Sequence, residues 1–388
     1  MYKFLTIFVC LLATTVAFAQ DGPPPMPEID GEIVVQGLNG PQGLLVDSEG
    51  NLWIAEAGLG GDEEITFFNV NTYEQEPGLV GESTRLIRRS PDGTQETVMM
   101  LSSVTAGQDR LGSGRLAELD GQIYFTHGIW GEFIGDEVTV PNFGTVMRVE
   151  DGEAVQVADI WAHENAENPD GLDLRETHPY GLTASPDGML LVADAAGNSL
   201  LSVDPASGEV TTVAGFEPIE GVFPNPVMNN EMLAQSVPTA STFDADGNLY
   251  VSYLSGAPFV PGSAKIVSLS EDGEVSDFAT QLTMLTDLTT GPDGNMYATQ
   301  FAIFGRQGPV VNSGGVVRIS PEGEAEMVVG GLPNVTAITF DAEGGAYVAI
   351  NGANPPFVPD GLGMVVYYPD MIEREGMPMP DLEPPSDD

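Results

Sequence analysis

A short unit, a glycine turn followed by an apolar strand, recurs six times along this chain of 388 residues. The first copy is the turn 48–51 with the strand 52–55, and the last is the turn 343–345 with the strand 346–348. The turn glycines of the six copies are Gly50, Gly121, Gly188, Gly247, Gly294 and Gly344. A unit that recurs about every 60 residues indicates one array of like structural units, and not two or three unrelated domains.

Five of the six copies contain a second turn glycine further on, which predicts four antiparallel strands per unit. These glycines are Gly93, Gly152, Gly208, Gly273 and Gly323. The sixth copy lacks this second hairpin, but segment 30–38 has the same form as segment 322–332. The missing strand therefore stands at the other end of the chain.

We predict an all-β protein, a six-bladed β-propeller of four-stranded antiparallel blades over residues 31–369. The N-terminal strand, residues about 31–36, completes the last blade and closes the ring without a free edge. An open β-solenoid is the alternative, but it would not need a displaced terminal strand.

The first twenty residues have the pattern of a secretory signal peptide. Lys3 precedes an apolar run, and the small residues Ala17 and Ala19 mark a cleavage site, so we expect a leader at 1–19 and a periplasmic or extracellular protein. The apolar run is too short to span a membrane; a buried N-terminal helix is the alternative. The one cysteine, Cys10, lies in this leader, which excludes disulfides, zinc–thiolate sites and cysteine nucleophiles from the mature chain.

Two further segments flank the predicted propeller. Residues 20–30 are rich in proline and are expected to be flexible, and residues 370–388 are acidic, rich in proline and expected to be disordered. The chain as a whole has 12 Lys and Arg against 58 Asp and Glu, a formal net charge of −46. Nucleic acids and anionic membrane surfaces are therefore excluded as partners, because both would be repelled.

Four long connections are expected on one face of the propeller, opposite the short glycine turns, and functional loops collect on such a face. They are residues 58–84, 128–144, 159–178 and 216–237. Arg175 is their only basic residue among many acids, and their aromatic residues are Phe67, Phe68, Tyr73, Trp130, Phe133, Phe143, Trp161, Phe216 and Phe223. An acidic rim concentrates cations, and aromatic side chains can floor a ligand site. The alternative is that the acids solvate the surface and the aromatics pack the loops together.

Polar residues at the strand ends of this face are candidates for a ligand site at the mouth of the central channel. They are Asn39, Gln42, Glu56, His127, His178, Tyr180, Asp194, Thr239, Asp287, Gln300, Asn334 and Asn351. The carboxylates of Glu56, Asp194 and Asp287 are the candidate metal ligands, for Ca²⁺ or Mg²⁺, since both ions prefer oxygen ligands. The alternative is that each polar side chain bonds neighbouring backbone groups or channel water.

Other motifs do not add a catalytic site. The sequence contains no Gly-x-Ser-x-Gly elbow, no phosphate-binding glycine loop with lysine and no His-Glu-x-x-His helix. Segment 244–248 begins like a calcium-binding loop, but Ser255 stands where that loop requires glutamate.

Several segments are similar to known propeller families. The turn-and-strand units resemble the NHL and SMP-30/gluconolactonase groups of six-bladed propellers. A closer resemblance is to the ScyD/ScyE family, named from the scytonemin pigment cluster of cyanobacteria, at residues 37–44, 54–58, 158–171, 178–182, 194–198 and 254–264. This resemblance implies a six-bladed propeller, export and a link to secondary-metabolite or pigment processes. Lactonases of the wider group hold calcium with Glu, Asn and Asp, but no such set aligns here residue by residue.

Three functions are consistent with these observations. The leading hypothesis is an exported, non-catalytic binding or scaffold module that holds a small molecule, Ca²⁺ or a protein partner on its acidic loop face. The alternative is a metal-dependent lactonase, hydrolase or lyase of the SMP-30/gluconolactonase type at the channel mouth. A structural protein of the cell surface is the third, and it predicts no ordered pocket.

Overall fold

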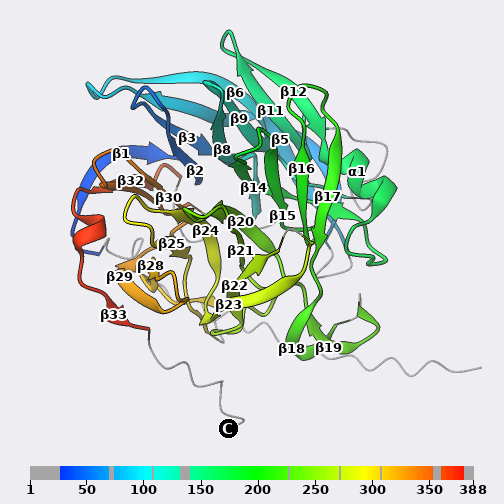
Figure 1. Cartoon of the computed structure of the whole chain (residues 1–388). Helices are drawn as coiled ribbons and strands as arrows, with labels where there is room; N and C mark the ends of the chain where they lie inside the picture. Colours follow the sequence, from blue (N-terminus) through cyan, green and yellow to red (C-terminus); the bar gives the residue numbers. More distant parts are fainter. Residues whose placement is uncertain are drawn as a thin grey trace, which may run out of the picture.

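The computed structural model describes residues 27–69, 74–106, 109–131, 140–225, 228–270, 272–305, 308–352 and 360–379. Within these residues the chain forms six β-sheets of four to six strands and three two-stranded ribbons. The six sheets are arranged around a common centre (Figure 1). The prediction of an all-β, antiparallel fold is confirmed. The predicted signal peptide lies outside the described residues.

We number the six sheets along the chain. Sheet 1 contains β2 (Pro41–Val46), β3 (Leu52–Glu56), β4 (Glu63–Asn69), β5 (Glu74–Arg89), β6 (Gln95–Ala106) and β7 (Asp109–Leu111). Sheet 2 contains β8 (Ser113–Leu119), β9 (Gln122–His127), β11 (Thr145–Glu150) and β12 (Glu153–Asp159). Sheet 3 contains β14 (Pro179–Ala184), β15 (Leu190–Asp194), β16 (Ser199–Val203) and β17 (Val210–Gly215).

The second half of the chain repeats this arrangement. Sheet 4 contains β20 (Pro238–Phe243), β21 (Leu249–Tyr253), β22 (Ala264–Leu269) and β23 (Val275–Leu282). Sheet 5 contains β24 (Leu285–Thr290), β25 (Met296–Gln300), β28 (Gly314–Ile319), β29 (Ala325–Leu332) and β33 (Met377–Pro378). Sheet 6 contains β30 (Ala337–Phe340), β31 (Ala346–Ile350), β32 (Gly363–Tyr368) and the N-terminal strand β1 (Glu32–Leu38).

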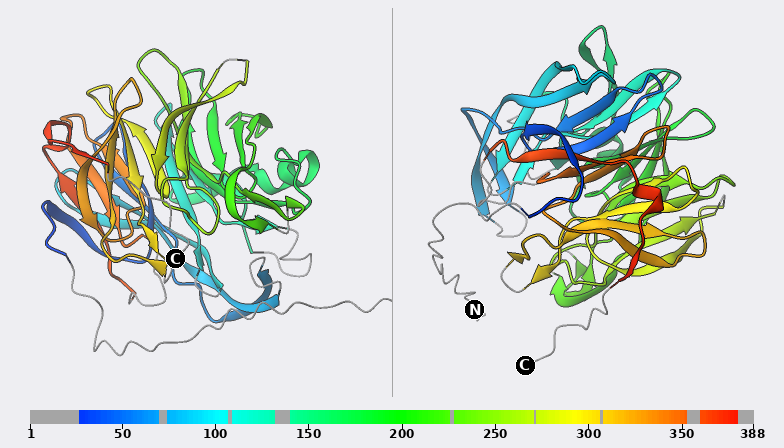
Figure 2. Two further views of the ribbon diagram at one scale, coloured as in Figure 1. Left: turned by 90° about the horizontal axis from the view of Figure 1, so that it is seen from below. Right: turned by 90° about the vertical axis from the view of Figure 1, so that its left-hand side faces the viewer.

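Strand β1 pairs with the last long strand of the chain. It runs antiparallel to β32, with Glu32 opposite Tyr367 and Leu38 opposite Gly363, and Figure 2 shows the blue strand beside the orange ones. The sequence therefore predicted correctly that the N-terminal strand joins the sheet of the sixth repeat.

The long connections contain more regular structure than their loop assignment suggested. Residues 58–84 include β4 and half of β5, which form a hairpin that projects from one end of the molecule (Figure 2). β4 and β7 together make sheet 1 six-stranded, so the prediction of four strands in every sheet is wrong for sheets 1 and 5. The three ribbons pair β10 (Trp130–Gly131) with β13 (Glu176–Thr177), β18 (Ile219–Asn225) with β19 (Glu231–Ala234), and β26 (Phe304–Gly305) with β27 (Gly308–Pro309).

Helix α1 (Ile160–Glu167) was not predicted, yet its ends have clear signals. The carboxylate of Asp159 caps the N-terminus by accepting the N–H of Ala162, and Asn168 ends the helix in the left-handed conformation. Aspartate and asparagine are favoured at these two positions. The helix lies outside sheets 2 and 3, at the edge of the molecule (Figure 1).

In several repeats an aspartate fixes the first turn. In sheet 1, Gly50 adopts φ +82° and donates its N–H to the carbonyl of Asp47, at 2.9 Å. The Asp47 carboxylate accepts the N–H groups of Glu49 and Asn51 and the indole N–H of Trp53. Asp244 bonds in the same way, so segment 244–248 is a repeat turn whose carboxylate is already occupied.

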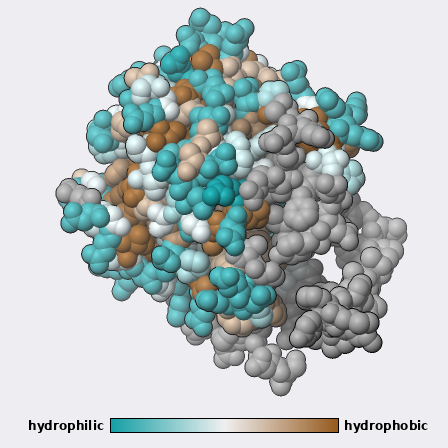
Figure 3. All heavy atoms as spheres, turned by 90° about the vertical axis from the view of Figure 1, so that its right-hand side faces the viewer, coloured by the Kyte–Doolittle hydropathy of each residue, from teal (hydrophilic) through white to brown (hydrophobic). Residues whose placement is uncertain are grey.

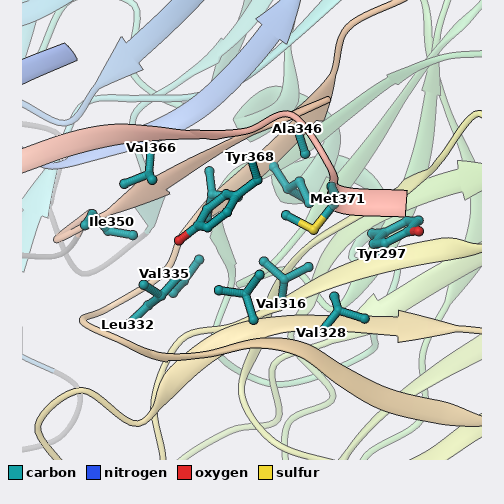
Figure 4. Close-up of a cluster of buried hydrophobic side chains, with 13 residues drawn as sticks. Tyr297, Val316, Val328, Leu332, Val335, Ala346, Ile350, Val366, Tyr368 and Met371 are labelled. Carbon is teal, nitrogen blue, oxygen red and sulfur yellow. The ribbon is translucent and has the colours of Figure 1, made fainter. Parts of the chain in front are cut away.

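The hydrophobic core is divided into one layer between each pair of neighbouring sheets. Separate clusters of buried side chains join sheets 1 and 2, 2 and 3, 3 and 4, 4 and 5, and 5 and 6. A sixth cluster joins sheet 6 to sheet 1 through Val35, Leu38, Leu44 and Ile54. Figure 4 shows the layer between sheets 5 and 6, where Tyr297 and Val316 face Val366 and Tyr368.

The segment after β32 is partly ordered, and the prediction of disorder from residue 370 is therefore wrong for its first part. Residues Met371–Glu373 form a 3-10 turn that buries Met371, and β33 pairs with β29. Arg374 ties this segment to the start of the chain, because its guanidinium contacts the carboxylates of Asp370 and Asp30. Residues 380–388 lie outside the described residues.

In the described part of the chain, no helix has the length and apolar character needed to cross a bilayer. Figure 3 shows the side of the molecule that lies at the right in Figure 1, where hydrophilic residues cover much of the surface and hydrophobic side chains form small separate patches.

Candidate functional site

The first strands of the six sheets line the centre of the molecule, and we call them the inner strands. In chain order they are β2, β8, β14, β20, β24 and β30, and each contacts the next, including β30 with β2. Threonine hydroxyls join neighbours at this centre: Thr239 Oγ1 donates to the carbonyl of Leu285 at 2.9 Å, and Thr336 Oγ1 to that of Pro41 at 2.6 Å. The starts of the inner strands are thereby held rigidly together.

One buried arginine ties four of the inner strands together. Arg115 of β8 is 4% exposed, and its Nη2 donates to the carbonyls of Thr286 and Thr336. Its Nε lies 3.2 Å from Oδ1 of Asp287, and its guanidinium lies 4.6 Å from the centre of the Tyr180 ring. Together with Asp287, whose carboxylate also accepts the N–H of Ile338 in β30, Arg115 forms a charged link at the centre of the fold.

A pocket with a volume of about 300 Å³ opens at the end of the molecule where the inner strands begin. Its apolar wall includes Leu111, Val237, Leu254, Met284 and Phe301. Its polar lining comprises Gln42, Asp109, Arg110, Ser113, His178, Tyr180, Thr239, Thr286 and Thr336. A concave, mainly apolar pocket with a few converging polar groups is the usual form of a small-molecule site.

Four of the twelve candidate residues line this pocket: Gln42, His178, Tyr180 and Thr239. The Tyr180 hydroxyl donates to Oε1 of Gln42 at 3.0 Å, and the rings of His178 and Tyr180 meet edge to face at 5.3 Å. Among the described residues the His178 ring has no hydrogen-bond partner. Burial, together with the charge of Arg115, lowers the pKa of His178 to about 4, so its imidazole is neutral at pH 7.

Each of the three candidate metal ligands accepts hydrogen bonds from neighbouring groups, and the three do not meet at one point. Glu56 forms a two-pronged ion pair with Arg85, at 2.6 and 2.7 Å, and accepts the N–H of Asn39. Asp287 binds Arg115 and accepts the N–H of Ile338. Asp194 accepts the hydroxyl of Thr177 and the N–H groups of His178 and Gly197. In the described residues, no three His, Cys, Asp or Glu side chains are grouped to hold a metal ion.

The other candidates stabilise connections beside the pocket. The side-chain oxygen of Asn39 accepts the N–H of Gly361, and the side-chain amides of Gln300 and Asn351 donate to the carbonyls of Ser313 and Leu362. Asn334 accepts the N–H of Gly352 through its backbone carbonyl.

His127 is fully buried against Phe143, with its Nδ1 3.1 Å from the Ser113 hydroxyl. Burial lowers the pKa of His127 to about 3, so it is neutral at pH 7. It belongs to the packing of sheet 2.

Three of the described aromatic residues of the long connections, Trp130, Phe143 and Phe216, pack into cores. Trp130 and Phe143 belong to a small core with Ile65 and Val104 under the extension of sheet 1. Phe216 packs on Tyr253 at 5.2 Å, and Phe223 is 65% exposed. None of the described aromatics of these connections lines the pocket. Tyr73 and Phe133, and the side chains of Phe67 and Phe68, lie outside the described parts.

Arg115 and the apolar wall were missed by the sequence reasoning. A signal for Arg115 was present, because it is the only basic residue in the otherwise apolar and small-residue segment 112–119 that begins the second repeat. The contribution of Asp109, Arg110 and Leu111 had no such signal. They reach the pocket because β6 and β7 extend sheet 1 beyond the repeat pattern.

No protein-family model and no curated protein sequence matches the chain. Solved structures do. A candidate oxidoreductase of the glucose dehydrogenase type from Thermus thermophilus aligns with a TM-score of 0.51 and 16% identity, over 87% of this chain and 98% of its own. A candidate gluconolactonase aligns with a TM-score of 0.50 and 14% identity, over 91% and 96%. A protein of unknown function from Bacteroides thetaiotaomicron aligns with a TM-score of 0.50 and 12% identity, over 89% and 74%.

These similarities cover most of the chain at identities too low to transfer an activity. They show that the chain shares a β-propeller-like fold with these proteins. The fold was expected from the repeats, and the comparisons support a propeller family at this level.

Proposed function

We propose that this protein is an exported, six-bladed β-propeller that binds a small molecule in the pocket at the end of its inner strands. The closed ring is supported by the contact of β30 with β2 and by the sixth core layer between sheets 6 and 1. Export is supported by the leader pattern at 1–19.

The pocket is the single observation that carries the binding function. Its volume suits a small organic molecule, and its polar groups converge from different sheets. Asp109 and Arg110 are the only Asp, Glu, Lys or Arg residues among the lining residues. The ligand is therefore an uncharged, partly apolar molecule that exchanges hydrogen bonds with Tyr180, Gln42 or His178. The resemblance to the ScyD/ScyE family extends this proposal to a secondary metabolite or pigment precursor.

We expect Leu254→Trp to abolish this binding, because a larger side chain on the apolar wall fills the pocket. The probe is N-phenyl-1-naphthylamine, an uncharged fluorescent molecule of two aromatic groups, titrated while its emission is recorded. The wild type should enhance the emission with saturation, and Leu254→Trp should weaken binding at least tenfold. The matched control, Leu79→Trp, alters an exposed leucine of β5 that does not line the pocket. Equal binding by the wild type and Leu254→Trp would remove the pocket from the proposal.

A lactonase or lyase is the second candidate, and His178 is the observation that favours it. Its neutral imidazole lines the pocket beside the Tyr180 hydroxyl, and a neutral histidine is able to take a proton as a general base. The carboxylates Glu56, Asp194 and Asp287 do not assemble a metal centre for this reaction, so the imidazole would act without that set.

Lactone hydrolysis separates the two candidates. If the enzyme hypothesis holds, the wild type should open δ-gluconolactone faster than the buffer, and His178→Ala should lose about 10²–10⁴-fold of that rate, the usual contribution of a general base. Acid release at constant pH is the readout. A wild-type rate equal to that of His178→Ala and of the buffer would leave the binding protein as the function.

A further inference from the structure

A second group of chemically unusual residues lies between helix α1 and sheet 3, outside the pocket. It contains the carboxylates of Glu164, Asp170, Glu176 and Asp194, with Arg175 as the neighbouring positive charge. The group belongs to neither the pocket lining nor the core layers. Four carboxylates so close together require protons, a positive side chain or a cation to compensate their charge.

Glu164 is the residue that requires an explanation. It is 1% exposed, and within the described part of the chain neither of its carboxylate oxygens has a hydrogen-bond partner. Helix α1 buries the side chains of Ile160 and Glu164, and its two caps fix where the helix begins and ends. An ionised carboxylate that is buried without partners is strongly destabilising, so such groups take a proton, an ion pair or a metal ion.

The carboxylate of Glu164 faces that of Asp194 across Gly197. A methyl group on Gly197 would lie 3.0 Å from Asp194 Oδ2 and 3.2 Å from Glu164 Oε2, so the two oxygens border one small space that the missing side chain leaves open. Ser199 stands directly opposite Asp194 in the β15–β16 ladder, and its buried hydroxyl has no partner. Residues opposite each other in an antiparallel pair project from the same face of the sheet.

We propose that Glu164, Asp194 and Ser199 bind a calcium ion that links helix α1 to sheet 3. Calcium takes six to eight oxygen ligands from carboxylates, amide carbonyls and water in a flexible arrangement, whereas magnesium requires a near-ideal octahedron. A site of this kind needs only two carboxylates, because hydroxyl and water oxygens complete the shell. This also explains why no group of three acidic or imidazole side chains marks it.

The test compares melting temperatures of the chelated wild type, Glu164→Gln and Glu167→Gln at pH 7.5, with 1 mM Ca²⁺, 1 mM Mg²⁺ or no divalent cation. Glu167 is an exposed carboxylate of the same helix and is the matched control for calcium attracted by the acidic surface. We expect calcium to raise the melting temperature of the wild type and of Glu167→Gln by about 3–5 °C, and magnesium to raise it less. Glu164→Gln should gain nothing from calcium, because the substitution removes a ligand carboxylate.

Two results would overturn the site. One is a wild type that calcium does not stabilise, which would leave a proton shared between Glu164 and Asp194 as the compensation. The other is an equal calcium shift in the wild type and Glu164→Gln. Gly197→Ala provides an independent check if Glu164→Gln does not fold: its methyl group occupies the space between the two carboxylates, and calorimetric titration should lose one calcium-binding event relative to Glu167→Gln. Retention of that event would also contradict the proposal.

Discussion

Replacing Arg115 by methionine should lower the free energy of unfolding by about 3–5 kcal/mol, the usual cost of removing one partner of a buried ion pair. Methionine keeps much of the length of the side chain but leaves Asp287 buried without its positive partner, and it frees the carbonyls of Thr286 and Thr336. Both members of the pair are less than 10% exposed, so water cannot replace the lost contacts. Urea unfolding followed by tryptophan fluorescence measures the change.

Two controls make this prediction specific. Arg88→Met removes an exposed ion pair with Glu96, which should change the free energy by less than about 1 kcal/mol. The double variant Arg115→Met, Asp287→Asn should be less destabilised than the sum of its single variants, because no buried charge remains unpaired. A loss for Arg115→Met no larger than that for Arg88→Met would show that the arginine is not the central link of the inner strands.

Shortening Leu38 to alanine should lower the free energy of unfolding by about 2–5 kcal/mol, the range for buried leucines. Leu38 is 1% exposed and comes from β1, yet its core layer contains Leu44 and Ile54 of sheet 1 and Val365 of sheet 6. The substitution therefore tests whether the N-terminal strand carries the contact between the last and first sheets. Urea midpoints give the value.

Ile33→Ala is the matched control on the same strand. Ile33 is 38% exposed, so its truncation should cost less than about 1 kcal/mol. If Leu38→Ala were as mild as Ile33→Ala, β1 would be a peripheral addition and the proposed closure of the ring would fail.

The fold could be predicted from the sequence because the repeats contain the residues that form their own turns. The turn aspartates and glycines, such as Asp47 and Gly50, fix local hairpins, and the displaced segment at 30–38 assigned β1 to the last sheet. The extension of sheet 1 and the pairing of β33 with β29 could not be predicted from the sequence. They depend on strand pairings beyond the repeat, which turn signals do not specify.

The residues that line the pocket could be predicted from the sequence only in part, for a related reason. Sequence position placed Gln42, His178, Tyr180 and Thr239 at the correct end of the inner strands. It did not tell which polar groups were already paired: Glu56 was matched to Arg85 and Asp287 to Arg115 by contacts between residues distant in the chain. A list of polar strand ends therefore contains both ligand-facing and structural residues, and only the three-dimensional pairing separates them.

The pairing of β1 with β32 can form only after β32 has been synthesised. β1 is synthesised well before its partner at residues 363–368. Val365, which lies in the same core layer as Val35 and Leu38, is likewise made much later than they are. Since contacts between distant segments form slowly, the pairing of β1 with β32 is a late step of folding.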